Sequence, residues 1–280
     1  MPFIRSPAGS RAGARYPAPV SRTPSLHGLR FAFGTLTVLP VRVHRWDWEA
    51  ARGGMLNAPV AGLAVGVGAA GLGLVLLVLG AGPLLAAVAS VAVPAALTRG
   101  LHLDGLADTA DGLGSGKPAE DALRIMKRSD IGPFGVITLL LVLLAQVAAL
   151  AQLYGDSWTR GATAALTSAV TARLALTLAA RTGVPAARPE GLGAAVAGVV
   201  PVPGALAVAA AVTLVSAAWG AALGPYGALR AAAAVPLSLA AAELLLRHCT
   251  RRFGGVTGDV FGALAETAAT SALVVLSFGR

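Results

Sequence analysis

The feature that most constrains the fold of this chain is a series of long apolar runs that continues almost to its C-terminus. An α-helix needs about 20 apolar residues to span the hydrocarbon core of a bilayer. Seven runs reach or approach that length: 55–79, 84–98, 131–153, 161–180, 204–223, 228–246 and 260–278. The sequence therefore predicts an all-α, polytopic membrane bundle. We expect six to eight transmembrane helices, because the second run is short and the first is rich in glycine.

The composition excludes other structural classes. Only 12% of the residues are charged and 56% are hydrophobic, whereas a soluble domain has about 25% charged residues. A chain this apolar is neither a water-facing globule nor disordered over most of its length. The single cysteine, Cys249, excludes an intrachain disulfide framework. An outer-membrane barrel would show alternating segments of about ten residues, and the runs here are unbroken.

The basic residues predict an orientation in the membrane. The chain has 22 Lys and Arg against 13 Asp and Glu, a net charge of +9. We expect residues 1–25 to be a disordered basic tail and 26–280 to be a single membrane-embedded catalytic domain. The loops 99–130, 181–203 and 247–258 hold most of the remaining basic residues. The positive-inside rule then predicts a cell-membrane protein with these long loops in the cytoplasm, and no nucleic-acid partner is needed to explain the charge.

A stripe of three aspartates follows the second apolar run. Asp104, Asp108 and Asp111 are spaced i, i+4 and i+7, so on a helix their carboxylates share one face. Three like charges on one stripe repel one another and favour a cation, and hard oxygen ligands suit Mg²⁺ or Mn²⁺. Such a stripe beside arginines at a membrane surface is what metal-assisted phosphoryl transfer requires. A solvated acidic turn is the alternative reading.

Basic side chains near the stripe are candidates for binding phosphate. Arg124, Lys127 and Arg128 share a face of a predicted amphipathic helix over 119–128. They could clamp a phosphate or anchor the helix at the lipid surface. Arg173 lies in the middle of an apolar run, and a charge inside the membrane is a functional candidate by default.

A glycine-rich turn near the C-terminus is a second candidate site. It runs from Gly254 to Gly258 and precedes Asp259. A turn that opens a helix can cradle phosphate with its backbone N–H groups, although tight interhelical turns use glycine too. The loop 188–193 also contains glycines and is a similar candidate for binding phosphate. His102, beside the acidic stripe, is either a structural histidine or a proton carrier.

Together these segments resemble the cobalamin synthase family, the adenosylcobinamide-GDP ribazoletransferases. The resemblance runs from about Phe31 to the C-terminus. Its strongest motifs are HLDGLADTADG at 102–112, RIMK at 124–127, IGPFG at 131–135 and GGVTGD at 254–259. The chain departs from the family in two places. The family usually has Asp-Ser-Arg where Arg128-Ser129-Asp130 stands here, and commonly has Gln in place of Val256.

The resemblance implies a specific reaction. The cobinamide-phosphate part of adenosylcobinamide-GDP is transferred to α-ribazole or its 5′-phosphate, and GMP leaves, with Mg²⁺ as the cofactor. Asp104, Asp108 and Asp111 would be metal ligands with Asp259 as a fourth, and Asp104, Asp108 or His102 would take the hydroxyl proton. The substrate-binding residues would be Arg124, Lys127, Arg173, Gly255, Thr257 and Gly258. The partners would be these two substrates and the lipid bilayer, and a homo-oligomer stays open.

Two other readings compete with this one. A CDP-alcohol phosphotransferase also binds metal with aspartates at helical spacing, but its Asp-Gly is followed by Ala-Arg. Here Asp104-Gly105 is followed by Leu106-Ala107-Asp108. A secondary transporter would suit spans rich in glycine and proline. Against a transporter, the acidic cluster lies in a predicted cytoplasmic loop and not at the bilayer midplane.

Overall fold

The computed structural model describes residues 26–279, and the predicted basic tail lies outside them. Helices make up this part of the chain, and it contains no β-strand. The helices are α1 (Leu26–Leu36), α2 (Trp48–Leu56), α3 (Ala58–Val78), α4 (Pro83–Leu97), α5 (Leu101–Gly114), α6 (Ala119–Ile125), α7 (Pro133–Asp156), α8 (Trp158–Ala179), α9 (Leu192–Val196), α10 (Val202–Gly220), the 3₁₀ turn η1 (Ala221–Leu223), α11 (Pro225–Phe253) and α12 (Gly258–Ser277).

The long helices confirm the predicted membrane bundle. Six of them are long and apolar enough to cross a bilayer, namely α3, α7, α8, α10 extended by η1, α11 and α12. A seventh span results if α4 and α5 are counted together as one broken span. The chain is therefore a multi-pass membrane protein with a helix number inside the expected range. The main difference in boundaries is α11, which continues to Phe253, well past the predicted end at residue 246.

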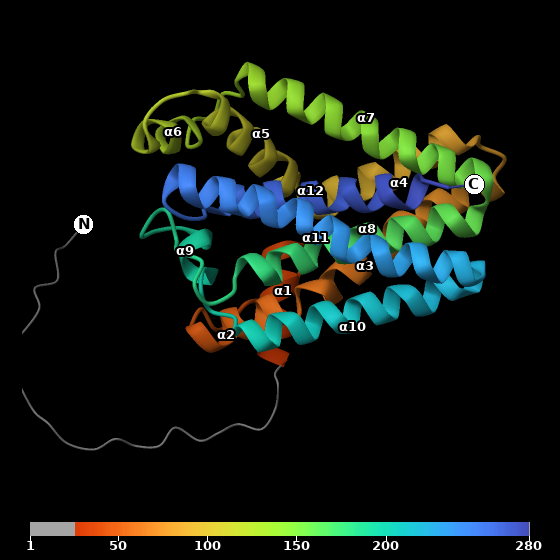
Figure 1. Ribbon diagram of the computed structural model, residues 1–280, viewed down its shortest axis with the longest axis horizontal. Helices are drawn as coiled ribbons and strands as arrows, with labels where there is room; N and C mark the ends of the chain where they lie inside the picture. The colour runs from red at the N-terminus through yellow and green to blue at the C-terminus, as the bar shows by residue number, and fades with distance from the viewer. Residues whose placement is uncertain (1–25, 280) are drawn as a thin grey trace, which may run out of the picture.

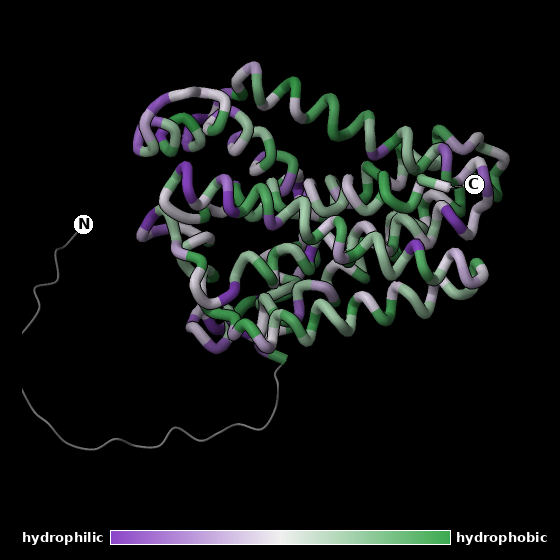
Figure 2. Tube along the Cα trace, in the orientation of Figure 1, coloured by the Kyte–Doolittle hydropathy of each residue, from purple (hydrophilic) through white to green (hydrophobic). Residues whose placement is uncertain are grey.

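The connections between the long helices gather at two ends of the bundle (Figure 1). One end carries α2, α6, α9 and the turn between α11 and α12, and the other carries the short turns after α3, α7 and α10. Hydrophilic residues concentrate at the first end (Figure 2). We call this first end the polar end. It contains the long loops, rich in basic residues, that the positive-inside rule predicted to lie on one side of the membrane.

Small residues let the central helix of the bundle pack closely. α8 contacts α3, α7, α10, α11 and α12, and most of its side chains are buried. Its buried residues are largely alanine, threonine and serine. A Cβ atom on Gly62 of α3 would lie 2.6 Å from the carbonyl oxygen of Ala169 in α8. Inside lipid no hydrophobic force drives helices together, so the van der Waals packing that such close backbone approach allows stabilises their association.

A sharp bend between α4 and α5 positions the acidic stripe. The two helices meet at 87°. Arg99 and Gly100 form the bend with left-handed φ values of 53° and 70°. α5 then packs between α12 and α7 at the polar end of the bundle. The sequence placed residues 101–112 in a cytoplasmic loop, whereas the structure makes them a packed helix, as their spacing had indicated.

Candidate active site

Two glycines bring α5 and α12 unusually close together. A Cβ atom on Gly105 of α5 would lie 2.6 Å from the carbonyl oxygen of Asp259. A Cβ atom on Gly262 of α12 would lie 3.0 Å from the carbonyl oxygen of His102. Any larger residue at Gly105 would therefore push the two backbones apart. The contact brings the aspartates of α5 beside Asp259, although 155 positions separate Asp104 and Asp259 in the sequence.

Asp111, the last residue of the stripe, fixes α5 to the start of α7. Its Oδ2 accepts a hydrogen bond from the backbone N–H of Gly132 at 2.7 Å, and its Oδ1 accepts one from Gly135 at 2.9 Å. Carboxylates are favoured at this position because the first N–H groups of a helix lack partners and carry partial positive charge. Asp111 is buried, and both of its oxygens already have donors. Its predicted role as a metal ligand stays a prediction.

Asp104 and Asp108 line the larger of two cavities near the polar end, with a volume of about 840 Å³. Within residues 26–279, neither carboxylate has an ion pair or a side-chain hydrogen bond. Other lining residues include Thr35, Thr37, Arg99, Arg128, Ser129 and Asp130. The cavity therefore combines two unpaired carboxylates with two guanidinium groups.

The negative charge of the site is poorly compensated. Burial, together with the charges of Asp104, Asp259 and Asp111, raises the pKa of Asp108 to about 7, while Arg188 opposes the shift. Asp108 thus titrates much nearer to neutral pH than an ordinary aspartate, because burial and neighbouring carboxylates disfavour its charged form. His102 is fully buried, and burial together with the charge of Arg173 holds its pKa well below the usual range. The His102 imidazole is therefore neutral.

Asp104, Asp108 and Asp259 offer the kind of oxygen ligands that Mg²⁺ prefers. No three His, Cys, Asp or Glu side chains in the described part of the chain converge tightly enough to enclose a metal by themselves. Mg²⁺ usually keeps several waters and binds through one or two carboxylates together with substrate phosphates. The uncompensated charge around Asp108 fits such an open site.

A smaller cavity of about 270 Å³ is lined by residues of α5, of α12 and of the turn before α12, among them His102, Thr257, Gly258 and Asp259. Thr257 caps α12, since its hydroxyl accepts from the N–H of Val260 at 3.2 Å and donates to Asp259 Oδ2 at 3.1 Å. Gly258 faces open space. Two of the three predicted substrate-binding residues in the glycine-rich turn, Thr257 and Gly258, therefore border a cavity.

Gly255, the third, has a different environment. A Cβ atom there would lie 2.5 Å from the backbone of Ala186 and Ala187. The neighbouring Val256 exchanges backbone hydrogen bonds with Pro185 and Ala187, both at 2.9 Å. The glycine permits this close pairing of two loops and borders neither cavity. Its predicted contact with substrate is untested.

The predicted phosphate-binding residues are dispersed. Arg124 is exposed and pairs with Asp121 at 2.7 Å, and Lys127 is exposed as well. Neither borders the two cavities. Arg128 and Asp130 form an ion pair at 3.3 Å on the wall of the larger cavity. The two residues at which this chain departs from the family pattern therefore pair with each other here.

Arg173 lies inside the bundle on α8 and lines neither of the two cavities. It is 2% exposed, and its Nε and Nη2 atoms have no hydrogen-bond partner. It borders a small internal cavity of about 30 Å³ with Gln146 and Glu266, which hydrogen-bond to each other at 2.9 Å. A role of Arg173 in holding substrate phosphate remains a prediction.

Sequence reasoning missed two arginines at the site. Arg99 borders the larger cavity, and Arg188 borders the smaller one and faces Asp108 and Asp259 electrostatically. In the sequence, Arg99 counted only as a loop charge that indicates orientation, and the loop 188–193 was a candidate phosphate-binding turn in which Arg188 itself had no assigned role. Arg99 directly precedes Gly100, and Arg188 precedes the glycines of 191–193. These neighbouring glycines were the sequence signals that could have identified the two arginines.

Comparison with known proteins adds an independent finding. Residues 28–277 match the family model described as cobalamin-5-phosphate synthase. The chain is 44% identical over 261 residues to the adenosylcobinamide-GDP ribazoletransferase of Frankia casuarinae, covering 89% of this chain and 93% of that protein. It is 40% identical over 252 residues to the Nocardioides protein of the same name, covering 88% and 96%. The Bradyrhizobium diazoefficiens protein of that name is 41% identical over 252 residues, covering 88% and 92%. No solved structure matches the chain.

Proposed function

Because this chain belongs to the cobalamin-5-phosphate synthase family, we propose that it is an adenosylcobinamide-GDP ribazoletransferase. A hydroxyl oxygen of α-ribazole, or of its 5′-phosphate, attacks the phosphorus that carries the cobinamide. The bond between that phosphorus and the bridging pyrophosphate oxygen breaks, and GMP leaves. The observation that carries this proposal is the pair of unpaired carboxylates, Asp104 and Asp108, on the wall of a cavity of about 840 Å³.

We propose Mg²⁺ as the cofactor, held by Asp104 and Asp259. A bound Mg²⁺ offsets the negative charge of the pyrophosphate. The absence of ion pairs to Asp104 among the described residues supports this assignment. Asp111 contributes indirectly, since its two hydrogen bonds to the start of α7 hold the acidic helix in position.

Asp108 is the best candidate for the group that accepts the hydroxyl proton. It borders the larger cavity, and its pKa of about 7 is matched to a general base at neutral pH. His102, buried and neutral, is the second candidate. Arg99 and Arg128 border the same cavity and would bind the pyrophosphate oxygens with charge-assisted hydrogen bonds.

We further propose that the polar end faces the cytoplasm of a cell in whose membrane the bundle sits. The loops at this end carry most of the basic residues of the described chain. The positive-inside rule favours that orientation.

A reconstitution experiment tests the function. The purified protein in detergent receives adenosylcobinamide-GDP and α-ribazole, with Mg²⁺ or with EDTA, and chromatography follows GMP and the cobalamin product. We expect equal amounts of both products with Mg²⁺ and neither with EDTA. Folded protein that forms no cobalamin with either form of ribazole would refute the proposal. Product formation in EDTA would refute only the metal assignment.

A further inference from the structure

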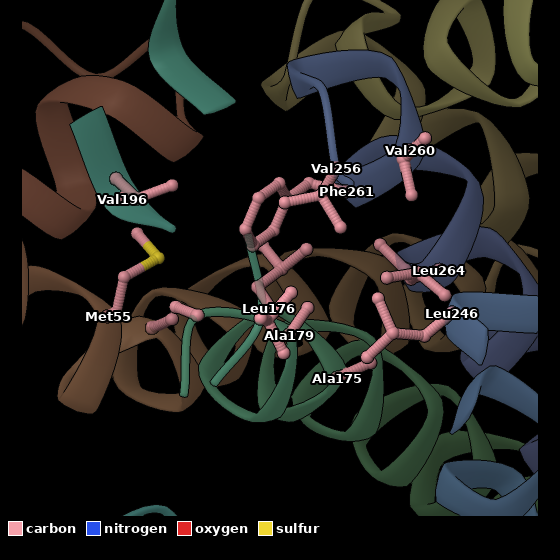
Figure 3. Close-up of a cluster of buried hydrophobic side chains, with 14 of the residues drawn as sticks. Met55, Ala175, Leu176, Ala179, Val196, Leu246, Val256, Val260, Phe261 and Leu264 are labelled. Carbon is pink, nitrogen blue, oxygen red and sulfur yellow. The ribbon is translucent and has the colours of Figure 1, made fainter. Parts of the chain in front are cut away.

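The smaller cavity has a wall that the proposed chemistry does not use. Apart from its polar residues and glycines, it is lined by eight apolar side chains: Leu36, Met55, Leu101, Leu176, Leu192, Val196, Val256 and Phe261. Figure 3 shows Met55 and Val196 on one side and Phe261 on the other, with Leu176 beneath them. The opening toward the polar end carries Glu190 and Gly191, which are exposed. The cavity is therefore apolar at its inner end and polar at its mouth.

One residue that lines this cavity has a buried polar atom without a partner. His102 lines it and is 4% exposed, and its Nε2 makes no hydrogen bond within the described chain. An unsatisfied polar atom in a native structure calls for an explanation, because leaving it unpaired costs free energy. A ligand atom that reaches His102 from this cavity would supply the missing hydrogen bond.

We propose that this cavity is the subsite for the aromatic base of the nucleoside acceptor, and this inference rests on the proposed function. The flat, largely apolar benzimidazole ring of ribazole would lie between Phe261 and the pair of Met55 and Val196. Its ribose would then point to the mouth, where Asp259 and Arg188 lie. Its attacking hydroxyl would then lie beside Asp259, which the α5–α12 contact brings next to the aspartates of α5.

The two other large groups of the substrates fit this cavity less well. A corrin ring needs far more room than about 270 Å³, and the cavity of about 840 Å³ lined by Asp104 offers it. Guanine carries several donors and acceptors on its edges, and burying them unpaired costs free energy. The eight apolar lining residues of the smaller cavity outnumber the polar ones, which are His102, Arg188, Glu190, Thr257 and Asp259, so this cavity suits an apolar ring better than guanine.

The first test narrows the cavity and uses a matched control on the same helix. Val196 borders the cavity, whereas Ala195, its neighbour on α9, is exposed and does not. We expect Val196→Phe to raise the KM for α-ribazole about tenfold or more and to leave the KM for adenosylcobinamide-GDP unchanged. Ala195→Phe leaves both unchanged. An increase in the KM for adenosylcobinamide-GDP alone, or in neither, would overturn the proposal.

The second test measures binding without turnover and uses a small substitution, Val196→Cys, that preserves the fold if the phenylalanine does not. The one native thiol, Cys249, is fully buried, so the wild-type protein provides the background rate. We expect saturating α-ribazole to protect the introduced thiol of Val196→Cys from a methanethiosulfonate reagent about tenfold or more, and adenosylcobinamide-GDP to give no protection. A thiol that the reagent cannot reach, or that α-ribazole leaves unprotected, would overturn the proposal.

The two tests separate this inference from the proposed function. Wild-type protein that releases GMP and forms cobalamin, together with an unprotected thiol in Val196→Cys, refutes the subsite and leaves the transferase standing. Protection by α-ribazole in a protein whose wild type forms no cobalamin refutes the transferase and supports the subsite.

Discussion

The contact between α5 and α12 makes Gly105→Ala the most informative single substitution. The new methyl group would lie 2.6 Å from the carbonyl oxygen of Asp259 and 2.9 Å from its Cα atom. Both are backbone atoms and cannot rotate away. Normal contact begins at about 3.5 Å, so α5 must move by roughly 1 Å relative to α12.

That displacement allows the two consequences to be estimated. Overpacking of this kind costs about 1–3 kcal/mol of stability, so the protein should still fold. A shift of about 1 Å between groups that must act together can reduce the rate about 100-fold. We therefore expect kcat/KM for GMP release to fall about 100-fold in Gly105→Ala, with a modest loss of thermal stability in detergent.

Two further glycines calibrate this measurement. In Gly262→Ala the new methyl group would lie 3.0 Å from the carbonyl oxygen of His102, a milder overlap, whereas Gly71 of α3 has no atom within 4 Å of the corresponding position. The expected loss of activity decreases from Gly105→Ala to Gly262→Ala and is absent in Gly71→Ala. Wild-type activity in Gly105→Ala, or equal losses in all three variants, would refute the reasoning.

Three other predictions follow from the site. Because Asp108 must lose its proton to act and its pKa is about 7, kcat/KM should rise as the pH increases through 7. A higher Mg²⁺ concentration should move the midpoint of this rise in kcat/KM to lower pH, since a nearby cation stabilises the carboxylate. A pH–rate profile that is flat between about 6 and 8 would contradict the role of Asp108 as the base. Asp111→Ala leaves two N–H groups at the start of α7 without acceptors and should lower the free energy of unfolding by about 2–5 kcal/mol, whereas Asp111→Asn should cost less; unchanged melting of the alanine variant would exclude the capping role. R128D and D130R together exchange the charges of the Arg128–Asp130 pair and keep one guanidinium on the cavity wall, because both residues line it; activity should stay within about threefold. R128D alone removes that guanidinium and should lose more, as GMP release assays would measure.

The sequence was sufficient for the features that depend on local pattern. The apolar runs predicted the membrane helices because each span needs a continuous stretch of the same character. The spacing of Asp104 and Asp108 predicted a helix with both carboxylates on one face, and the structure confirms that both line one cavity. The order of the loops along the chain also predicted which of them meet at the polar end.

Other features depend on partners far away in the chain and could not be read from it. Asp111 continues the stripe, yet its carboxylate faces the start of α7, and nothing in the spacing distinguishes it from Asp104. The left-handed φ of Arg99 arises from the 87° bend between two packed helices. Gly255 looks like part of a phosphate-binding turn, but its backbone lies against the loop around Ala186. Tertiary packing decided each of these roles.

The central claim is that the acidic face of α5 is the centre of the transferase reaction, and one comparison tests it most directly. Asp104→Asn removes a carboxylate from the cavity, and Asp156→Asn removes one at the opposite end of the bundle, where it pairs with Arg160. Both variants are assayed for GMP release and cobalamin formation with saturating Mg²⁺. We expect Asp104→Asn to lose at least about 100-fold in kcat and Asp156→Asn to keep wild-type activity. Wild-type turnover in a folded Asp104→Asn protein would contradict the account.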